Sequence, residues 1–109
     1  LKPRLPSVFF SEQPSSTQTY ARLFILQKCL DVICGILSLN QSQATLVNTF
    51  IILREMCAEY PHMLFDESAE NCAVVTSLVL NHSFSAFPLV RREAAATIYW
   101  LAKVNYKNN

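Results

Sequence analysis

The chain has 109 residues, a length typical of a single domain with one modest core. Hydrophobic residues make up 51% of it, and its net charge of +1 comes without a basic block or an acidic tail, so we expect no nucleic-acid partner and no transmembrane segment. A single glycine argues against a β-rich fold with many tight turns. Because the chain begins with Leu1 and shows no secretory signal pattern, we interpret it as a fragment of a longer protein.

The N-terminal residues 1–19 differ in composition from the rest of the chain. They contain three prolines, several serines and the apolar cluster Val8–Phe10. Two interpretations stay open. One is an extended arm or linker that docks through Phe9 and Phe10, and the other is a flexible terminus without a docking role. The chain is therefore divided into an arm at 1–19 and a helical domain at 20–109.

The first predicted helix runs from Tyr20 to Leu39. Its apolar residues recur at helical spacing and leave only a narrow polar stripe, formed by Lys28, Asp31, Gly35 and Ser38. A stripe this narrow covers too little of the circumference for a surface helix. We therefore expect this helix to be packed on more than one side.

The second predicted helix runs from Ala44 to Tyr60. Asn40 or Ser42 is the expected N-cap, and Pro61 ends the helix because it lacks an N–H donor and disfavours helical geometry at the residue before it. Its apolar positions are Leu46, Val47, Phe50, Ile51, Leu53, Met56, Cys57 and Tyr60, and its expected solvent face carries Asn48, Glu55 and Glu59.

Two further helices are predicted, at Ser68–His82 and at Pro88–Tyr106. The acidic residues Asp66, Glu67 and Glu70 suit the positive N-terminus of the third helix, and Pro88 suits the first turn of the fourth. We expect the third helix to be buried through Ala69, Cys72, Ala73, Val75, Leu78, Val79 and Leu80.

Four helices with short connections predict an all-α, antiparallel array. This array is either a bundle or a slice of an α-solenoid of HEAT- or armadillo-like repeats. The apolar character of the first helix favours the slice, because solenoid repeats pack against neighbours at both ends.

The sequence carries no recognisable catalytic or cofactor-binding motif. With Gly35 as its only glycine, the chain contains no glycine-rich phosphate loop. His62 and His82 stand at helix edges without a metal-ligand partner nearby in the sequence, and we interpret each as a boundary histidine with its hydrogen bonds satisfied. We therefore expect this chain to have no catalytic residue, no bound metal and no cofactor.

The four cysteines show no C-x-x-C pair, and each stands among apolar neighbours. We interpret Cys29, Cys34, Cys57 and Cys72 as buried, reduced thiols, which favours a cytoplasmic location. Any recruitment to a membrane is then expected to occur through other domains of the parent protein.

The fourth helix begins with Arg91, Arg92 and Glu93, for which two interpretations stay open. One is a solvated helix start. The other is an arginine that reaches back to a carbonyl or carboxylate of the preceding helix.

Further along the same helix, three consecutive alanines predict close approach of a neighbouring backbone. Tyr99, Trp100 and Tyr106 add aromatic bulk with polar tips at the edge of the packed face. The helix is thus expected to lie between two neighbours, with its candidate packing and interlobe residues being Arg91, Ala94, Ala95, Ala96, Tyr99, Trp100, Asn105 and Tyr106.

The residue order of the chain resembles the DOCK (dedicator of cytokinesis) family of guanine nucleotide exchange factors. The matching signature is Val90-Arg91-x-x-Ala94-x-Ala96-x-Ile98-Tyr99-x-Leu101-x-Lys103-x-Asn105-Tyr106. Upstream, the same order continues in Tyr60-Pro61-x-x-Leu64-Phe65, an acidic stretch and Asn71-Cys72-Ala73, so the resemblance covers about residues 28–107. The chain departs from the family pattern at Trp100, at Ala102-Lys103, where Met-Arg is usual, and at Tyr106, where phenylalanine is usual.

The resemblance implies a role for the parent protein and a narrower one for this chain. In DOCK proteins the signature lies in the first helical lobe of the catalytic region, and later lobes bind a Rho-family GTPase of the Rac or Cdc42 type and release its nucleotide. The sequence resembles the zizimin-related branch. The implied role is a supporting lobe with no catalytic residue, and its implied partners are the downstream lobes and, through the parent, the GTPase. The alternative is a stand-alone HEAT- or armadillo-like adaptor that binds a peptide or helix, and a small helical enzyme is the weakest of the three readings.

Overall fold

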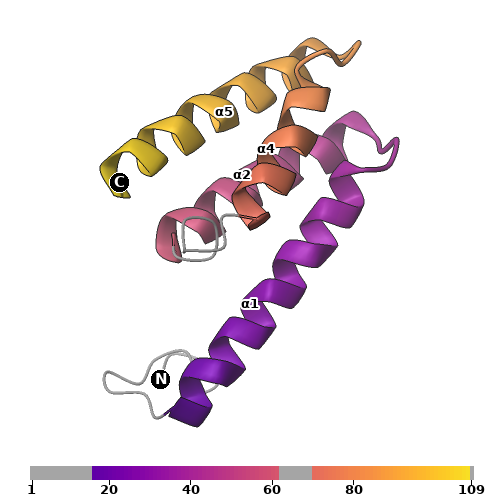
Figure 1. Ribbon diagram of the computed structural model, residues 1–109. Coiled ribbons are helices and arrows are strands. Elements are labelled where there is room, and N and C mark those ends of the chain that lie inside the picture. The colour runs from indigo at the N-terminus through magenta and orange to yellow at the C-terminus, as the bar shows by residue number, and fades with distance from the viewer. Residues whose placement is uncertain (1–15, 62–69, 109) are drawn as a thin grey trace, which may run out of the picture.

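The computed structural model describes residues 16–61 and 70–108, and these residues form four α-helices and no strand (Figure 1). The helices are α1 (Ser16–Leu37), α2 (Gln43–Glu59), α4 (Glu70–His82) and α5 (Pro88–Asn108). The prediction of an all-α fold is therefore confirmed for the described residues. The Val8–Phe10 cluster, His62, Asp66, Glu67 and Ala69 lie outside them.

Local chemistry explains where α2 begins and ends. Ser42 is its N-cap, with an extended backbone (φ −64°, ψ 157°), and its Oγ accepts a hydrogen bond from the Thr45 N–H at 3.2 Å. At the other end the Tyr60 N–H donates to the Met56 carbonyl at 2.9 Å, and Pro61 follows. Of the two caps that the sequence allowed, the structure uses Ser42.

The helices are arranged so that α2 and α4 each contact both α1 and α5. Figure 1 shows α5 along one side of this pair and α1 along the other, with the N-terminal half of α1 extending away from the other three helices. Residues 38–42 connect α1 to α2, and residues 83–87 connect α4 to α5. Two helix pairs with short turns thus cross one another around a shared core.

The core is made of aliphatic side chains that recur at helical spacing on all four helices. Phe50 and Leu53 of α2 are fully buried at its centre, together with Cys57. The remaining buried apolar residues are Leu26, Leu30, Ile33, Leu37, Leu46, Val75, Val79, Val90, Ala94 and Leu101.

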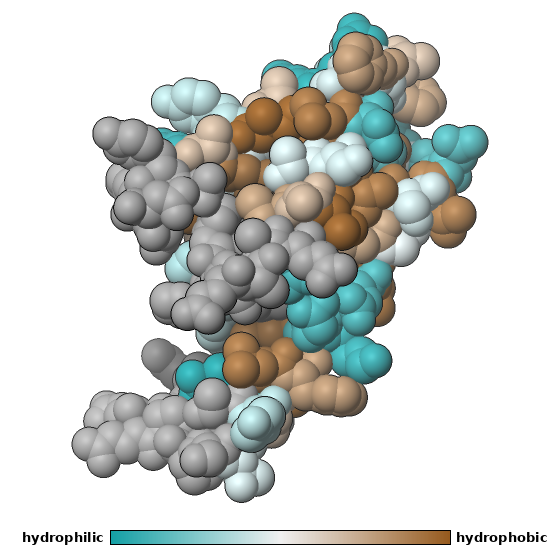
Figure 2. All heavy atoms as spheres, viewed as in Figure 1, coloured by the Kyte–Doolittle hydropathy of each residue, from teal (hydrophilic) through white to brown (hydrophobic). Residues whose placement is uncertain are grey.

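The prediction that the first helix is packed on more than one side is wrong within the described residues. Only one stripe of α1 is buried, because α2 and α4 both approach it from the same side. Elsewhere on α1, Leu23, Phe24 and Val32 are 50%, 65% and 62% exposed. Figure 2 shows hydrophobic side chains on the surface over α1 and near the turn between α4 and α5. The apolar composition of α1 therefore exceeds what this chain itself buries.

Three smaller expectations about burial also fail. On α4, Ala73 and Leu80 face solvent because α1 and α5 cover only the stripe around Val75 and Val79. On α2, Ile51 is 38% exposed, since it lies outside the buried stripe of that helix. The expected solvent face of α2 is confirmed, with its three polar residues exposed at Asn48, Glu55 and Glu59.

Candidate interaction surfaces

A side-chain network joins α2 to α5. The Arg54 guanidinium donates from Nη2 to the Glu93 carboxylate at 2.7 Å and from Nη1 to Thr97 Oγ1 at 2.8 Å. Arg54 Nη1 also lies 3.3 Å from the Glu93 carbonyl, to which Thr97 Oγ1 donates at 2.7 Å. Glu93 and Thr97 stand one turn apart on α5, so both face the same guanidinium. The network fixes the axial position of α5 against α2.

The sequence did not indicate this network. A solvated helix start, one of the two interpretations of this segment, would expose Glu93, yet its side chain is only 15% exposed. The one available signal was a lone arginine, Arg54, within the apolar stretch Phe50–Cys57. A cation at that position requires an anionic or polar partner when it is partly buried, but the partner lies thirty-nine residues away.

The turns at one end of the molecule are fixed by hydrogen bonds to backbone carbonyls. Arg91 Nη1 donates to the Ser85 carbonyl at 2.8 Å, so an arginine does reach back to a carbonyl, but this carbonyl belongs to the turn before α5 and not to the preceding helix, where the second interpretation expected it. His82 Nε2 lies 2.6 Å from the Leu37 carbonyl, and its ring packs edge-on against Phe50 with centroids 5.6 Å apart. His82 is therefore a boundary histidine with a satisfied hydrogen bond, as predicted.

The candidate residues on α5 fall into two groups. Ala94 is fully buried against the core, and Trp100 packs against its edge. Ala95 and Ala96 are exposed, as is Tyr99 at 71%. The close approach predicted for the alanines thus occurs at Ala94 within this chain. Arg91, another candidate, makes the hydrogen bond to the turn described above. Asn105 and Tyr106 belong to α5, but their side chains lie outside the part of the chain that the structure describes.

The four cysteines are free thiols that are buried to different degrees. Burial, with smaller contributions from Cys34 and Cys72, raises the pKa of Cys57 to about 12. Burial, followed by the negative charge of Asp31, also raises the pKa of Cys34. The prediction of burial is correct for Cys57, holds in part for Cys34 and Cys72, and is wrong for Cys29, which lies on the exposed side of α1. Neither Cys34 nor Cys57 has the lowered pKa of a nucleophilic thiol.

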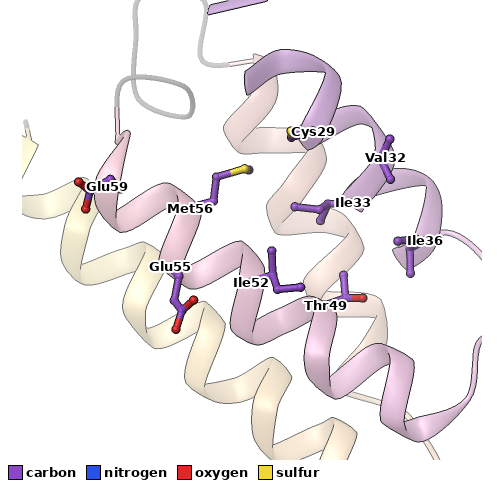
Figure 3. A pocket seen from close by; sticks show the side chains of 9 residues that line it. All are labelled: Cys29, Val32, Ile33, Ile36, Thr49, Ile52, Glu55, Met56 and Glu59. Carbon is purple, nitrogen blue, oxygen red and sulfur yellow. The ribbon is translucent and has the colours of Figure 1, made fainter. Parts of the chain in front are cut away.

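An apolar groove runs between α1 and α2, with a volume of about 660 Å³. Figure 3 shows Ile33 and Ile36 of α1 pointing toward α2, and Ile52 and Met56 of α2 pointing toward α1. Its other lining residues are Cys29, Val32, Thr49, Glu55 and Glu59. Ile52 is 54% exposed although it stands beside the core, so the groove is open to solvent.

Across residues 16–61 and 70–108, no three His, Cys, Asp or Glu side chains stand close enough together to hold a metal ion. None of the described helices is sufficiently long and apolar to cross a membrane. Two surfaces of the described helices are open to contact by other helices, namely the groove between α1 and α2 and the exposed side of α5.

Comparison with known proteins places the chain among relatives of one kind. It is 34% identical to dedicator of cytokinesis protein 8 from Mus musculus over 82 residues, which is 75% of this chain. It is 30% identical over 89 residues to dedicator of cytokinesis protein 7 from Homo sapiens and 28% identical over 82 residues to dedicator of cytokinesis protein 9 from Homo sapiens. Its homologues are DOCK-family proteins.

The chain spans about 4% of the length of each of these three DOCK relatives. No protein-family model matches the sequence, and no solved structure matches it. The family resemblance carried by the α5 signature is thus confirmed as homology to DOCK proteins. The matched segment includes most of the described helices, since the alignments cover 75% to 82% of the chain.

Proposed function

We propose that the chain is a supporting helical lobe of a Rho-family guanine nucleotide exchange factor. Homology to dedicator of cytokinesis proteins over three quarters of the chain carries this proposal. The family resemblance implies nucleotide exchange on Rac- or Cdc42-type GTPases for the parent, with the zizimin-related branch as the subfamily. The same homology favours this function over a stand-alone adaptor.

In this proposal the helix pairs α1–α2 and α4–α5 are two units of a solenoid-like array. Three observations support it. The pairs are joined internally by short turns, and α5 packs on α2 as well as on its own partner α4. Leu23 and Phe24, which α1 exposes outside the groove, are also apolar surface of the kind that a repeat leaves for a neighbouring unit to cover.

The exposed side of α5 is the proposed contact with the downstream lobes. Ala95 and Ala96 offer a surface with short side chains, which permits close approach of another helix, and Tyr99 offers aromatic area beside them. Arg54 and Glu93 lie on the opposite side of α5 and hold this surface in place. The chain's role is therefore mechanical, because it positions lobes that bind the GTPase.

A segment exchange tests this function. In dedicator of cytokinesis protein 8 from Mus musculus, the 82-residue segment that aligns with this chain is replaced by the chain's own residues. Release of fluorescent GDP from Rac- and Cdc42-type GTPases is then measured for the hybrid, the unchanged protein and a deletion of the segment. The proposal expects exchange by the hybrid and by the unchanged protein, none by the deletion, and none by this chain alone.

Two outcomes contradict the proposal. A hybrid that is folded, as judged by circular dichroism and gel filtration, but inactive would show that the chain cannot replace the segment. A deletion that exchanges nucleotide as fast as the unchanged protein would show that the segment supports nothing.

A further inference from the structure

The groove between α1 and α2 is walled by two matching stripes of residues. On α1 the stripe is Cys29, Val32, Ile33 and Ile36, and on α2 it is Ile52, Glu55, Met56 and Glu59. Each stripe follows the spacing i, i+3, i+4, i+7, which places its four members along one side of a helix. The two walls therefore run along their helices for about two turns, or roughly 10 Å.

The groove presents apolar surface that nothing in the described chain covers. Val32 and Ile52, one on each wall, are 62% and 54% exposed. Apolar area left in water contributes about 25 cal/mol per Å² when a partner buries it. An occupant with apolar side chains is thus favoured.

A helix suits this groove better than an extended peptide does. Both walls are α-helices, whose backbone N–H and C=O groups are already paired within each helix. An extended peptide would bury its own backbone groups without partners, whereas a helix satisfies them internally. The chain provides its own precedent, since α5 packs across α2 and α4 in the same way.

The charged residues along the groove determine which side chains are favoured along the edge of a bound helix. Glu55 and Glu59 are the charged residues among the described residues that line the groove, and neither forms an ion pair with another described residue. Figure 3 shows Glu55 pointing away from α1, on the flank of α2, and Glu59 at one end of the groove. A helix seated over Ile52 and Met56 therefore has one edge beside these carboxylates, and lysine or arginine on that edge complements them.

The same carboxylates disfavour two other occupants. In a two-fold pairing of two copies across this groove, Glu55 and Glu59 of one copy would face those of the other. An anionic membrane surface would be repelled by them. A second copy and a lipid surface are for this reason outcomes of the test and not the proposal.

We propose that the α1–α2 groove binds an amphipathic helix of a separate protein, with apolar side chains in the groove and lysine or arginine beside Glu55 and Glu59. This inference does not depend on the exchange-factor function. Its occupant is defined by chemistry, as two to three turns of helix with apolar residues at i, i+3, i+4 and i+7 and cations along one flank.

The test uses two synthetic probes and the 109-residue chain. The first probe is a fluorescein-labelled amphipathic helix of about 14 residues, with leucine on one face and lysine along its flank. The second probe is identical except that glutamate replaces each lysine. Fluorescence anisotropy is expected to show saturable binding of the lysine probe and at least about tenfold weaker binding of the glutamate probe.

Variants of the chain then locate the site. Glu55→Lys combined with Glu59→Lys should weaken the lysine probe by about tenfold and strengthen the glutamate probe. Asp31→Lys is the matched control, because Asp31 is exposed on α1 but borders a different hollow, between α1 and α4. This variant should leave the affinities for both probes nearly unchanged. Ile52→Asn should abolish binding, whereas Val74→Asn, an exposed position beside that second hollow, should not. Circular dichroism melts verify that each variant is folded.

Cys29 provides a readout that does not depend on charge. It is exposed and lines the groove, so a bound helix should slow its alkylation several-fold. Four results would overturn the proposal: no binding of the lysine probe, equal binding of both probes, affinity unchanged by the double glutamate variant, or no protection of Cys29. Two further results would also overturn the proposal. Self-association of the chain that is lost in Ile52→Asn would show that the groove binds a second copy. Binding to phosphatidylserine vesicles that is lost in Ile52→Asn would show that the groove binds lipid.

Discussion

Arg54 of α2 and Glu93 of α5 form an ion pair at 2.7 Å across thirty-nine residues of sequence. The second nitrogen of the same guanidinium binds Thr97, which is completely buried. Arginine alone among the cationic side chains presents two donors in one plane, so a single residue satisfies a carboxylate and a hydroxyl on successive turns. The consequence is that α5 has one preferred position along α2.

We expect Arg54→Ala to lower the free energy of unfolding by about 1–3 kcal/mol, because it leaves the Glu93 carboxylate largely buried without its cation. Arg54→Lys should recover only part of this loss, since an ammonium lacks the planar pair of donors. Urea denaturation measures both values.

Arg92→Ala is the matched control for that measurement. Arg92 lies 4.0 Å from the same Glu93 carboxylate, but its side chain is 73% exposed. Its removal should change stability by less than about 0.5 kcal/mol. A double-mutant cycle between Arg54→Ala and Glu93→Ala that returns no coupling energy would contradict a stabilising role for the network.

Ala94 is where added volume should be costly. Ala94→Leu places three more carbons into a fully buried site, and we expect a loss of about 1–3 kcal/mol. Ala95→Leu and Ala96→Leu change exposed positions and should stay within about 0.5 kcal/mol in the isolated chain. Thermal melts of the three variants test this order.

The exposed alanines should matter only in the larger protein. In the hybrid with dedicator of cytokinesis protein 8, Ala95→Leu or Ala96→Leu should slow GDP release if α5 contacts a downstream lobe as proposed. Hybrids with unchanged exchange rates for both variants would place the interlobe contact elsewhere.

Because of the Cys57 thiol, the free energy of unfolding should decrease at alkaline pH. Its pKa is about 12 in the native chain, against an ordinary value of 9.0, so the unfolded chain loses this proton first as the pH rises. The contribution of the protonated Cys57 thiol to the free energy of unfolding is complete below about pH 9 and is lost progressively between about pH 9 and pH 12. Between about pH 8 and pH 10.5 the free energy of unfolding should decrease by about 1–2 kcal/mol from this group.

Cys57→Ala isolates that contribution. The variant is less stable overall because it leaves a cavity, but its stability should decline less steeply with pH than that of the unchanged chain. Parallel pH profiles for the two proteins would show that Cys57 does not titrate differently on folding. In a separate alkylation series at neutral pH, Cys29 should react first and Cys57 last.

Ser42→Ala should cost about 1 kcal/mol, because it removes the acceptor for the Thr45 N–H at the start of α2. Ser77→Ala is the comparison, since Ser77 is exposed within α4, where alanine is the better helix former. The cap interpretation fails if chemical denaturation ranks the two variants as equal.

Much of the helical order was predictable because it depends on neighbours in the sequence. Ser42 and Pro61 delimit α2 through local hydrogen bonding and backbone restriction. The resemblance to the DOCK family was likewise carried by a linear order of residues, and the homologues of the chain are DOCK-family proteins. The start of the first helix was predicted less well, since α1 begins at Ser16 and not at Tyr20.

The candidate surfaces were harder to predict because they depend on pairs of residues far apart in the sequence. The groove needs Val32 and Ile52, which stand on two different helices, to line one hollow, and neither residue differs in type from those that are buried. The same limitation explains Cys29, whose apolar neighbours suggested burial on a side of α1 that no described helix covers.

The sequence by itself determined the all-α class, the order of the helices and the kinship with DOCK proteins, because helical periodicity, caps and motif order are all local properties. Only the tertiary structure decided which side of each apolar helix is buried and which partner Arg54 has. The physical reason is that burial is a relation between helices: α1 is apolar around most of its circumference, but α2 and α4 cover it from one side.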